Sequence, residues 1–159
     1  MTPDHSFEHR VELAVGRGLA FLGHRGRTVN ETLNRLTQRG FEADISQAAV
    51  ERLIEMGYLD DAKFCSEFVE GKRRLDHWGD DRIRNRLREL GAPREDVEKA
   101  LAVDDQGELQ RAIDLLERRL DAPAEEPAAH RKAMGILIRR GFAPSTAADA
   151  IRAHARIDS

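Results

Sequence analysis

A basic segment in the middle of the chain is the strongest candidate for binding chemistry. Between Lys72 and Arg94, eight cationic residues outnumber four acidic ones. Ammonium and guanidinium groups pair with phosphates and carboxylates, and an indole ring can stack on a base or anchor a protein interface. We therefore expect contact with nucleic acid or with an acidic protein surface. The candidate residues are Lys72, Arg73, Arg74, Trp78, Arg82, Arg84, Arg86 and Arg88.

Each of these residues also has a simpler interpretation. Charge-rich helices commonly carry arginines on a solvated face, and a tryptophan beside a turn is commonly a packing residue. The aromatic side chains of Tyr58, Phe64 and Phe68 are expected to pack in the core or between repeats.

No combination of residues in the sequence indicates catalysis. Cys65 is the only cysteine, which excludes an intramolecular disulfide and a multi-cysteine zinc site. It lies on the apolar side of an aromatic-flanked helix, which suggests an inert thiol. His5 and His9 have helical spacing but no third ligand, and no P-loop or dinucleotide fingerprint is present. We expect neither enzymatic activity nor a metal site or cofactor.

The composition limits how the protein could hold its partner. Of 159 residues, 35% are charged and 5% are aromatic, and the formal net charge is −3. A protein that binds nucleic acid through its whole surface is usually strongly basic, so any contact here must be local or must come largely through a protein partner. The chain lacks an apolar run of about 20 residues and a signal peptide, which predicts a cytoplasmic protein without membrane contact.

A Leu-x-x-x-Gly pattern recurs at intervals of about 50 residues and reveals the organisation of the chain. It ends at Gly40, Gly91 and Gly141, with aliphatic residues at matching positions after each glycine. Glycine adopts the left-handed conformation that often ends a helix, so each pattern predicts a turn between two helices. A further apolar helix precedes each pair, which gives three helices per repeat.

The predicted fold is all-α, with no sheet, and consists of three tandem three-helix repeats that form an elongated curved rod. The repeats are assigned to residues 1–57, with a short N-terminal tail, 58–103, and 104–159, with an acidic, proline-containing loop at 121–128. The expected helices are 7–24, 29–39, 46–56, 61–76, 81–90, 93–102, 105–121, 128–140 and 144–156. Thr28 is expected to open the second helix with a capping box, and Asp60 or Asp61 and Asp80 or Asp81 to cap later ones.

The middle repeat carries motifs more specific than the periodicity. They are Gly57–Phe64 (GYLDDAKF), the basic-ended helix Phe68–Arg74, Gly79, Arg82–Gly91 (RIRNRLRELG) and Val97–Leu101. Together they resemble the RecX family, regulators of the RecA recombinase. The resemblance covers about residues 10–156 and is strongest over 53–101. The segment His77–Asp81 departs from the family pattern, which is usually more basic there.

The resemblance implies a nine-helix protein that binds in the groove of the RecA–single-stranded DNA filament. It implies inhibition of RecA ATP hydrolysis, strand exchange and coprotease activity. We expect a monomer, with weak direct binding of single-stranded DNA. A stand-alone helix-turn-helix DNA-binding protein and a non-catalytic helical scaffold are the alternatives. The acidic third helix argues against the first of these.

Overall fold

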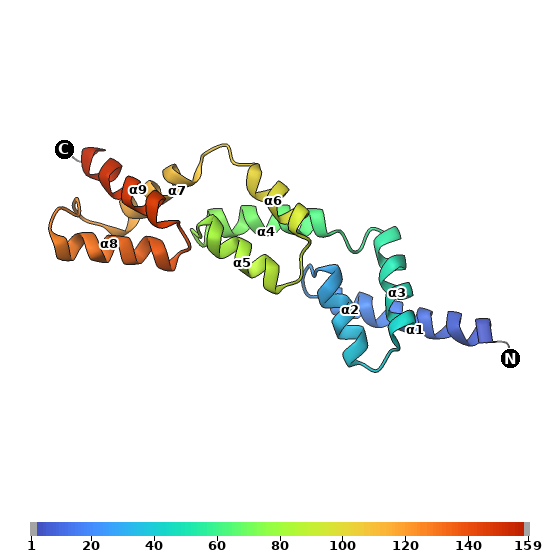
Figure 1. Cartoon of the computed structure of the whole chain (residues 1–159). Helices are drawn as coiled ribbons and strands as arrows, with labels where there is room; N and C mark the ends of the chain where they lie inside the picture. Colours follow the sequence, from blue (N-terminus) through green and yellow to red (C-terminus); the bar gives the residue numbers. More distant parts are fainter. Residues whose placement is uncertain (1–2, 158–159) are drawn as a thin grey trace. The chain divides into compact units, whose positions relative to one another are not determined.

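The computed structural model describes residues 3–157, with side chains from residue 6. In that range α-helices joined by turns and loops are its regular secondary structure (Figure 1). No strand occurs among the described residues, which confirms the all-α prediction. The nine helices are α1 (Pro3–Leu22), α2 (Val29–Gln38), α3 (Ala43–Glu55), α4 (Asp61–Leu75), α5 (Asp80–Glu89), α6 (Arg94–Ala102), α7 (Glu108–Arg119), α8 (Pro127–Arg139) and α9 (Pro144–Ile157).

Two helices begin three or four residues earlier than the sequence predicted. Helix α1 begins at Pro3, so the expected tail is reduced to residues 1–2, which lie outside the described range. Helix α3 begins at Ala43, directly after Glu42 in an extended conformation, which is where a helix N-terminus requires non-helical backbone.

The repeated glycines end helices as predicted. Gly40, Gly91 and Gly141 have φ of 92°, 79° and 95°, in the left-handed region that side chains rarely adopt. After the first and third of them, the N–H of the following phenylalanine donates to the carbonyl of the leucine that opens the pattern, at 3.2 and 3.1 Å. This i to i+5 bond is the signature of a Schellman turn, so the repeat pattern encodes helix ends.

Two compact units divide the chain: one contains the residues up to Cys65 with Arg88–Val97, the other Ser66–Leu87 with the residues from Glu98 onward. Each has an apolar core of mostly aliphatic side chains. The first core comprises Val11, Ala14, Leu36, Ile45, Ala49, Val50, Leu53 and Leu59. The second comprises Ala112, Ile113, Leu115, Leu116, Ala124, Ala133, Ile136, Leu137, Phe142, Ala147, Ala150 and Ile151. The middle repeat contributes to both units, and the predicted repeat boundaries and curved rod stay predictions.

Close helix packing explains one of two glycines inside α1. A Cβ at Gly18 would come within 2.7 Å of Leu53 Cδ1, whereas a Cβ at Gly16 would meet nothing within 4 Å. Gly18 therefore lets α3 approach α1, which offsets its cost of about 1 kcal/mol relative to alanine in a helix.

One type of joint between consecutive repeats occurs twice. Thr28, which caps α2, donates from its hydroxyl to the carbonyl of Leu90 at 2.6 Å, beside the Gly91 turn. In the second unit, Gly79 N–H, just before α5, donates to Arg140 carbonyl at 2.6 Å, beside the Gly141 turn. In both cases the start of a repeat's second helix contacts the glycine turn of the following repeat.

The caps explain how these helix starts are formed. Thr28 has the predicted capping box, in which its hydroxyl accepts from Glu31 N–H while the Glu31 carboxylate accepts from Thr28 N–H. Asp60 caps α4 by accepting from Lys63 N–H at 3.1 Å. The prediction of a cap at Asp80 or Asp81 is wrong, because both residues lie inside α5 and the Asp80 carboxylate binds arginines instead.

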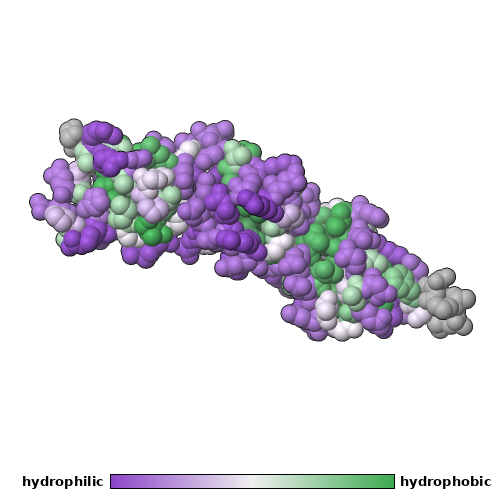
Figure 2. Space-filling view, in the orientation of Figure 1, coloured by the Kyte–Doolittle hydropathy of each residue, from purple (hydrophilic) through white to green (hydrophobic). Residues whose placement is uncertain are grey.

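The surface is predominantly hydrophilic. Figure 2 shows hydrophilic residues over most of the visible face, with apolar atoms in small patches. Tyr58 is 58% exposed, so it does not pack in the core. None of the described helices has both the length and the apolar character that a membrane span requires.

Candidate functional site

Trp78 lies at the centre of a cationic cluster in the turn between α4 and α5. Its ring is half-buried and meets Phe68 edge to face, with ring centroids 6.4 Å apart. Lys72 Nζ lies 4.6 Å and Arg82 Cζ 4.0 Å from the centroid of the indole. Such cation–π contacts stabilise by about 0.5–1 kcal/mol at exposed sites. The structure thus unites Lys72, Trp78 and Arg82, which we call the Trp78 cluster.

Backbone contacts with the turn between α8 and α9 hold this cluster. Beyond the Gly79–Arg140 bond, Asp81 N–H donates to Gly141 carbonyl at 3.2 Å. A Cβ on Gly79 would overlap the backbone of Gly141, and only a glycine fits. Arg82 Nη1 also donates to the carbonyl of Arg139 at 3.1 Å.

The same contacts bring two arginines of the third repeat to the site. Arg140 donates from its guanidinium to the carbonyl of Asp76, and Arg139 lies exposed at the end of α8. Sequence reasoning assigned these residues only to a helix end and missed their position beside the middle repeat. The repeat pattern alone could not reveal it, because the contact depends on which helix start meets the Gly141 turn.

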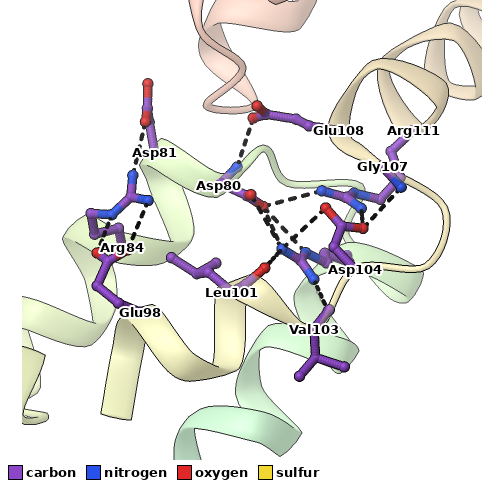
Figure 3. Close-up of polar contacts among 11 residues, drawn as sticks. Asp80, Asp81, Arg84, Glu98, Leu101, Val103, Asp104, Gly107, Glu108 and Arg111 are labelled. Atoms are coloured by element: carbon purple, nitrogen blue, oxygen red, sulfur yellow. Dashed lines mark hydrogen bonds and ion pairs between the residues drawn. The ribbon is translucent and has the colours of Figure 1, made fainter. Parts of the chain in front are cut away.

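Arg73 lies in a buried ion-pair network. Its side chain is 9% exposed, and it binds the Asp80 carboxylate at 3.0 Å and the carbonyl of Leu101 at 2.8 Å. Arg111 binds the same carboxylate at 3.2 Å and also pairs with Asp104. Figure 3 shows the side chains of Asp80, Asp104 and Arg111 pointing toward one another from α5, from the segment between α6 and α7, and from α7. Arg73 uses its donors within the chain, so its evident role is to hold these elements together.

The pKa values of two carboxyl groups in this region are shifted in opposite directions. Burial alone would raise the pKa of Asp104, but hydrogen bonds from Arg111 and Gly107 N–H, with the charge of Arg73, hold it below the ordinary value. Burial raises the pKa of Glu108, although its carboxylate accepts from Asp80 N–H at 3.1 Å. The network therefore favours the charged form of Asp104.

The remaining arginines of the predicted site are distributed along α4 and α5. Arg84 is paired, at 2.7 Å with Glu98 and 3.1 Å with Asp81, and the hydrogen bond that it donates to Glu98 raises its pKa. Arg74, Arg86 and Arg88 are exposed, and Arg88 belongs to the first compact unit.

Arg74 lines a groove of about 570 Å³ in the second unit, next to His77 and Arg118. Four arginines of the lining face four acidic side chains, so the groove has no excess of positive charge. His77 has φ of 55°, and burial, with the charges of Arg118 and Arg140, lowers its pKa.

The other reactive groups show no sign of catalytic activation. Cys65 is buried, and burial, with the nearby charges of Asp96 and Asp61, raises the pKa of its thiol to about 11. A thiol with such a pKa is a poor nucleophile at neutral pH. Over the described residues, no group of three or more potential metal ligands is found. The side chain of His5 lies outside that range.

Comparisons with known proteins agree on one family. Residues 14–53 match the model of the RecX first three-helix domain, and residues 60–101 match that of the RecX second three-helix domain. The regulatory protein RecX of Mycobacterium sp. (strain JLS) is 32% identical over 157 residues, covering 94% of this chain and 86% of the relative. That of Xanthomonas axonopodis pv. citri (strain 306) is 34% identical over 158 residues, with 98% and 94% covered.

Solved structures support the same fold. The crystal structure of RecX from Lactobacillus salivarius superposes with a TM-score of 0.81 at 18% identity, over 92% of this chain and 97% of that one. A second crystal structure, of regulatory protein RecX, superposes with a TM-score of 0.72 at 22% identity, over 86% of this chain and 70% of that one.

Proposed function

Because the chain belongs to the RecX family of regulatory proteins, we propose that it binds the filament of RecA on single-stranded DNA and inhibits RecA. The inhibited activities are ATP hydrolysis, strand exchange and the coprotease role. The protein acts by binding and performs no chemistry itself.

The observation that carries this proposal is the Trp78 cluster. Tryptophan and arginine dominate the binding energy of many protein interfaces when they are held in place. Here the indole contacts Lys72 and Arg82, and the turn that carries it is tied by backbone hydrogen bonds to the Gly141 turn. A rigid cationic surface loses little conformational freedom on binding, which favours affinity.

The charge of this surface suits both components of the filament. Arginine and lysine pair with DNA phosphates and with carboxylates of a protein surface. A ligand changes an equilibrium only through different affinities for two states, so inhibition requires tighter binding to a filament state that is less competent in ATP hydrolysis. We propose that Arg74 and Arg86 extend the contact along α4 and α5, while Arg73 and Arg84 position the helices.

Independent sequence-specific DNA binding is less well supported. A recognition helix needs cationic or amide side chains toward the major groove. Helix α3 exposes Asp44, Glu51 and Glu55, and its Arg52 is paired with Glu8 at 2.5 Å. Salt-resistant binding to one duplex sequence without RecA would favour this alternative. The monomeric state and cytoplasmic location stay predictions.

The decisive experiment measures RecA-dependent ATP hydrolysis on single-stranded DNA while this protein is titrated. We expect the rate to fall at stoichiometric amounts, and the variant with Lys72→Glu and Arg82→Glu to need at least about tenfold more protein, as for the loss of about 1.4 kcal/mol of binding energy. Arg131→Glu with Lys132→Glu, on exposed positions of α8, is the charge-matched control. An unchanged rate with the wild-type protein contradicts the proposal.

A further inference from the structure

His77 has an unusual backbone conformation in the turn between α4 and α5. Its φ of 55° lies in the left-handed region, and in the described part of the chain it is the only residue other than glycine with a positive φ. That conformation is unfavourable for a residue with a side chain, so contacts around it must hold it. On one side, Trp78 N–H donates to Lys72 carbonyl at 3.1 Å. On the other, the Arg140 guanidinium donates to Asp76 carbonyl.

The half-buried imidazole of His77 contacts a guanidinium group. Its Nε2 lies 3.5 Å from Nη1 of Arg118 on α7. A guanidinium only donates hydrogen bonds, so His77 Nε2 can accept from it only while this nitrogen carries no proton. When Nε2 takes up a proton from solvent, two donors and two positive charges face each other instead. The contact is therefore favourable in one protonation state of His77 and unfavourable in the other.

Charged groups of both signs surround the ring. Arg118 and Asp114 belong to α7, Arg140 directly follows α8, and Asp76 precedes His77 in the turn. Burial, and after it the charges of Arg118 and Arg140, lower the pKa of His77, while the charges of the two aspartates oppose them. The ring is therefore neutral at neutral pH and gains its proton below the ordinary range of histidine.

The carboxylates closest to the ring already have partners. Asp76 pairs with Lys72 at 3.2 Å. Asp114 accepts hydrogen bonds from the amide groups of Gln106 and Gln110. Two further charged groups, of opposite sign, line the groove on the α4 side: Glu70 and Arg74. A protonated imidazole would have to compete with these partners for a carboxylate, while both guanidinium groups would repel it.

We propose that His77 is a pH-sensitive switch for the turn that carries Trp78. While the ring is neutral, the turn keeps its hydrogen bonds to the Gly141 turn. A protonated ring is repelled by Arg118 and Arg140, and the left-handed backbone at His77 then relaxes and releases the turn. The switch operates in the free protein, whether or not the chain acts on RecA.

The emission of Trp78 reports on this turn alone, because it is the only tryptophan of the chain. The experiment titrates the fluorescence of the full chain from about pH 8 to about pH 5, across the range in which histidine titrates. We expect one transition with a midpoint below 6.5, the ordinary pKa of histidine. His77→Gln should abolish it, because an amide does not titrate, and His130→Gln, at an exposed position of α8, should keep it.

A pair of neighbouring arginines on α7 tests the repulsion itself. Arg118→Gln removes the guanidinium beside the ring and should move the midpoint to higher pH. Arg119→Gln, at the adjacent exposed position, is the matched control and should leave the midpoint unchanged. A midpoint that stays constant or falls in Arg118→Gln, or that moves equally in both variants, would overturn the proposal.

Hydrogen exchange distinguishes release of the turn from simple quenching of the indole by a charged imidazole. Relative to their intrinsic exchange rates, the Gly79 and Asp81 N–H groups should lose protection below the midpoint, because both donate to the Gly141 turn region. His77→Gln should retain this protection. Phe142 N–H, which donates to Leu137 carbonyl within its own repeat, is the internal control. Protection of Gly79 and Asp81 that is independent of pH would refute the switch even if the fluorescence changed.

The consequence for RecA inhibition rests on the proposed function. Below the midpoint, His77→Gln should inhibit RecA more strongly than the wild-type chain does at the same pH, and the two should be equal at neutral pH. Comparison at one pH cancels the pH dependence of RecA itself. If fluorescence and exchange change as expected but the wild-type chain inhibits RecA at no pH, the switch stands and the proposed function fails.

Discussion

Gly79 and Arg140 are joined by a 2.6 Å hydrogen bond from the N–H of the first to the carbonyl of the second, at a point where a Cβ on Gly79 would overlap the Gly141 backbone. Because glycine carries a hydrogen atom where other residues carry a Cβ, the turn that contains Trp78 can contact the Gly141 turn of the third repeat.

Gly79→Ala should destabilise the protein. Because the added methyl group meets backbone rather than a flexible side chain, the turn must move, at a cost of about 1–3 kcal/mol for an overpacked site. Urea unfolding measures the change. Gly71→Ala is the control, since a Cβ there meets nothing within 4 Å and alanine in a helix should stabilise by up to about 1 kcal/mol. Equal effects of the two substitutions would contradict the assigned contact.

Asp80→Asn should weaken the network that Arg73 and Arg111 form. Both guanidiniums lose a charged partner while 9% exposed, and breaking such a pair costs roughly 2–3 kcal/mol. The free energy of unfolding in urea is the measurement. Asp149→Asn removes the exposed partner of Arg152 and should change stability by less than about 1 kcal/mol.

The pH dependence of stability should respond to Asp104 and Glu108 in opposite ways. Asp104 has a depressed pKa in the folded state, so its stabilisation is present above the unfolded value of about 3.9 and disappears as the pH falls through the folded value. Asp104→Asn should therefore flatten the acid loss of stability. Glu108 has a raised pKa and favours the folded state at low pH, so Glu108→Gln should steepen that loss. Urea midpoints across the acid range test both signs.

Arg82 and Arg84 should differ in their importance for RecA inhibition. Arg82 contacts the Trp78 ring and is exposed, whereas Arg84 is paired with Glu98 and Asp81. Arg82→Ala should raise the protein concentration needed for half inhibition several-fold, and Arg84→Ala should raise it less. If Arg84→Ala has the larger effect, the Trp78 cluster is not the principal contact.

Cys65 should react slowly with a thiol reagent in the native protein. The thiol is fully buried, and its pKa of about 11 leaves little thiolate at neutral pH. Absorbance on reaction with a disulfide reagent should show at least about a hundredfold slower modification than in denaturant, since modification requires opening of the structure. Rapid native labelling would place Cys65 at the surface.

The fold was predictable because it depends on local signals. A glycine with positive φ, a threonine with glutamate three residues later and aliphatic residues at helical spacing all act within one or two turns of chain. Gly40, Gly141 and Thr28 behave in the structure as the sequence indicated. Asp80 does not, because Arg73 and Arg111, 7 and 31 residues away along the chain, bind its carboxylate.

The candidate site was predictable only as a list of residues. Charge counting treated Arg73, Arg82 and Arg84 alike, but their partners are distributed over the middle and third repeats and separate them into buried, exposed and paired groups. Arg27 and Arg35 escaped notice for the same reason. Arg27 lies in the loop between α1 and α2 and Arg35 lies on α2, and only folding brings both to the ring of Phe21.

The joint between repeats has a direction, with a helix start on one side and a glycine turn on the other. Thr28 donates a hydrogen bond beside the turn at Gly91, and Gly79 donates one beside the turn at Gly141. The turn at Gly40 is open by comparison, because a Cβ there would meet nothing within 4 Å. If a gene duplication placed another repeat before the first, the second helix of that repeat could donate a hydrogen bond to the turn at Gly40. Repeat number could therefore change during evolution without the invention of a new interface.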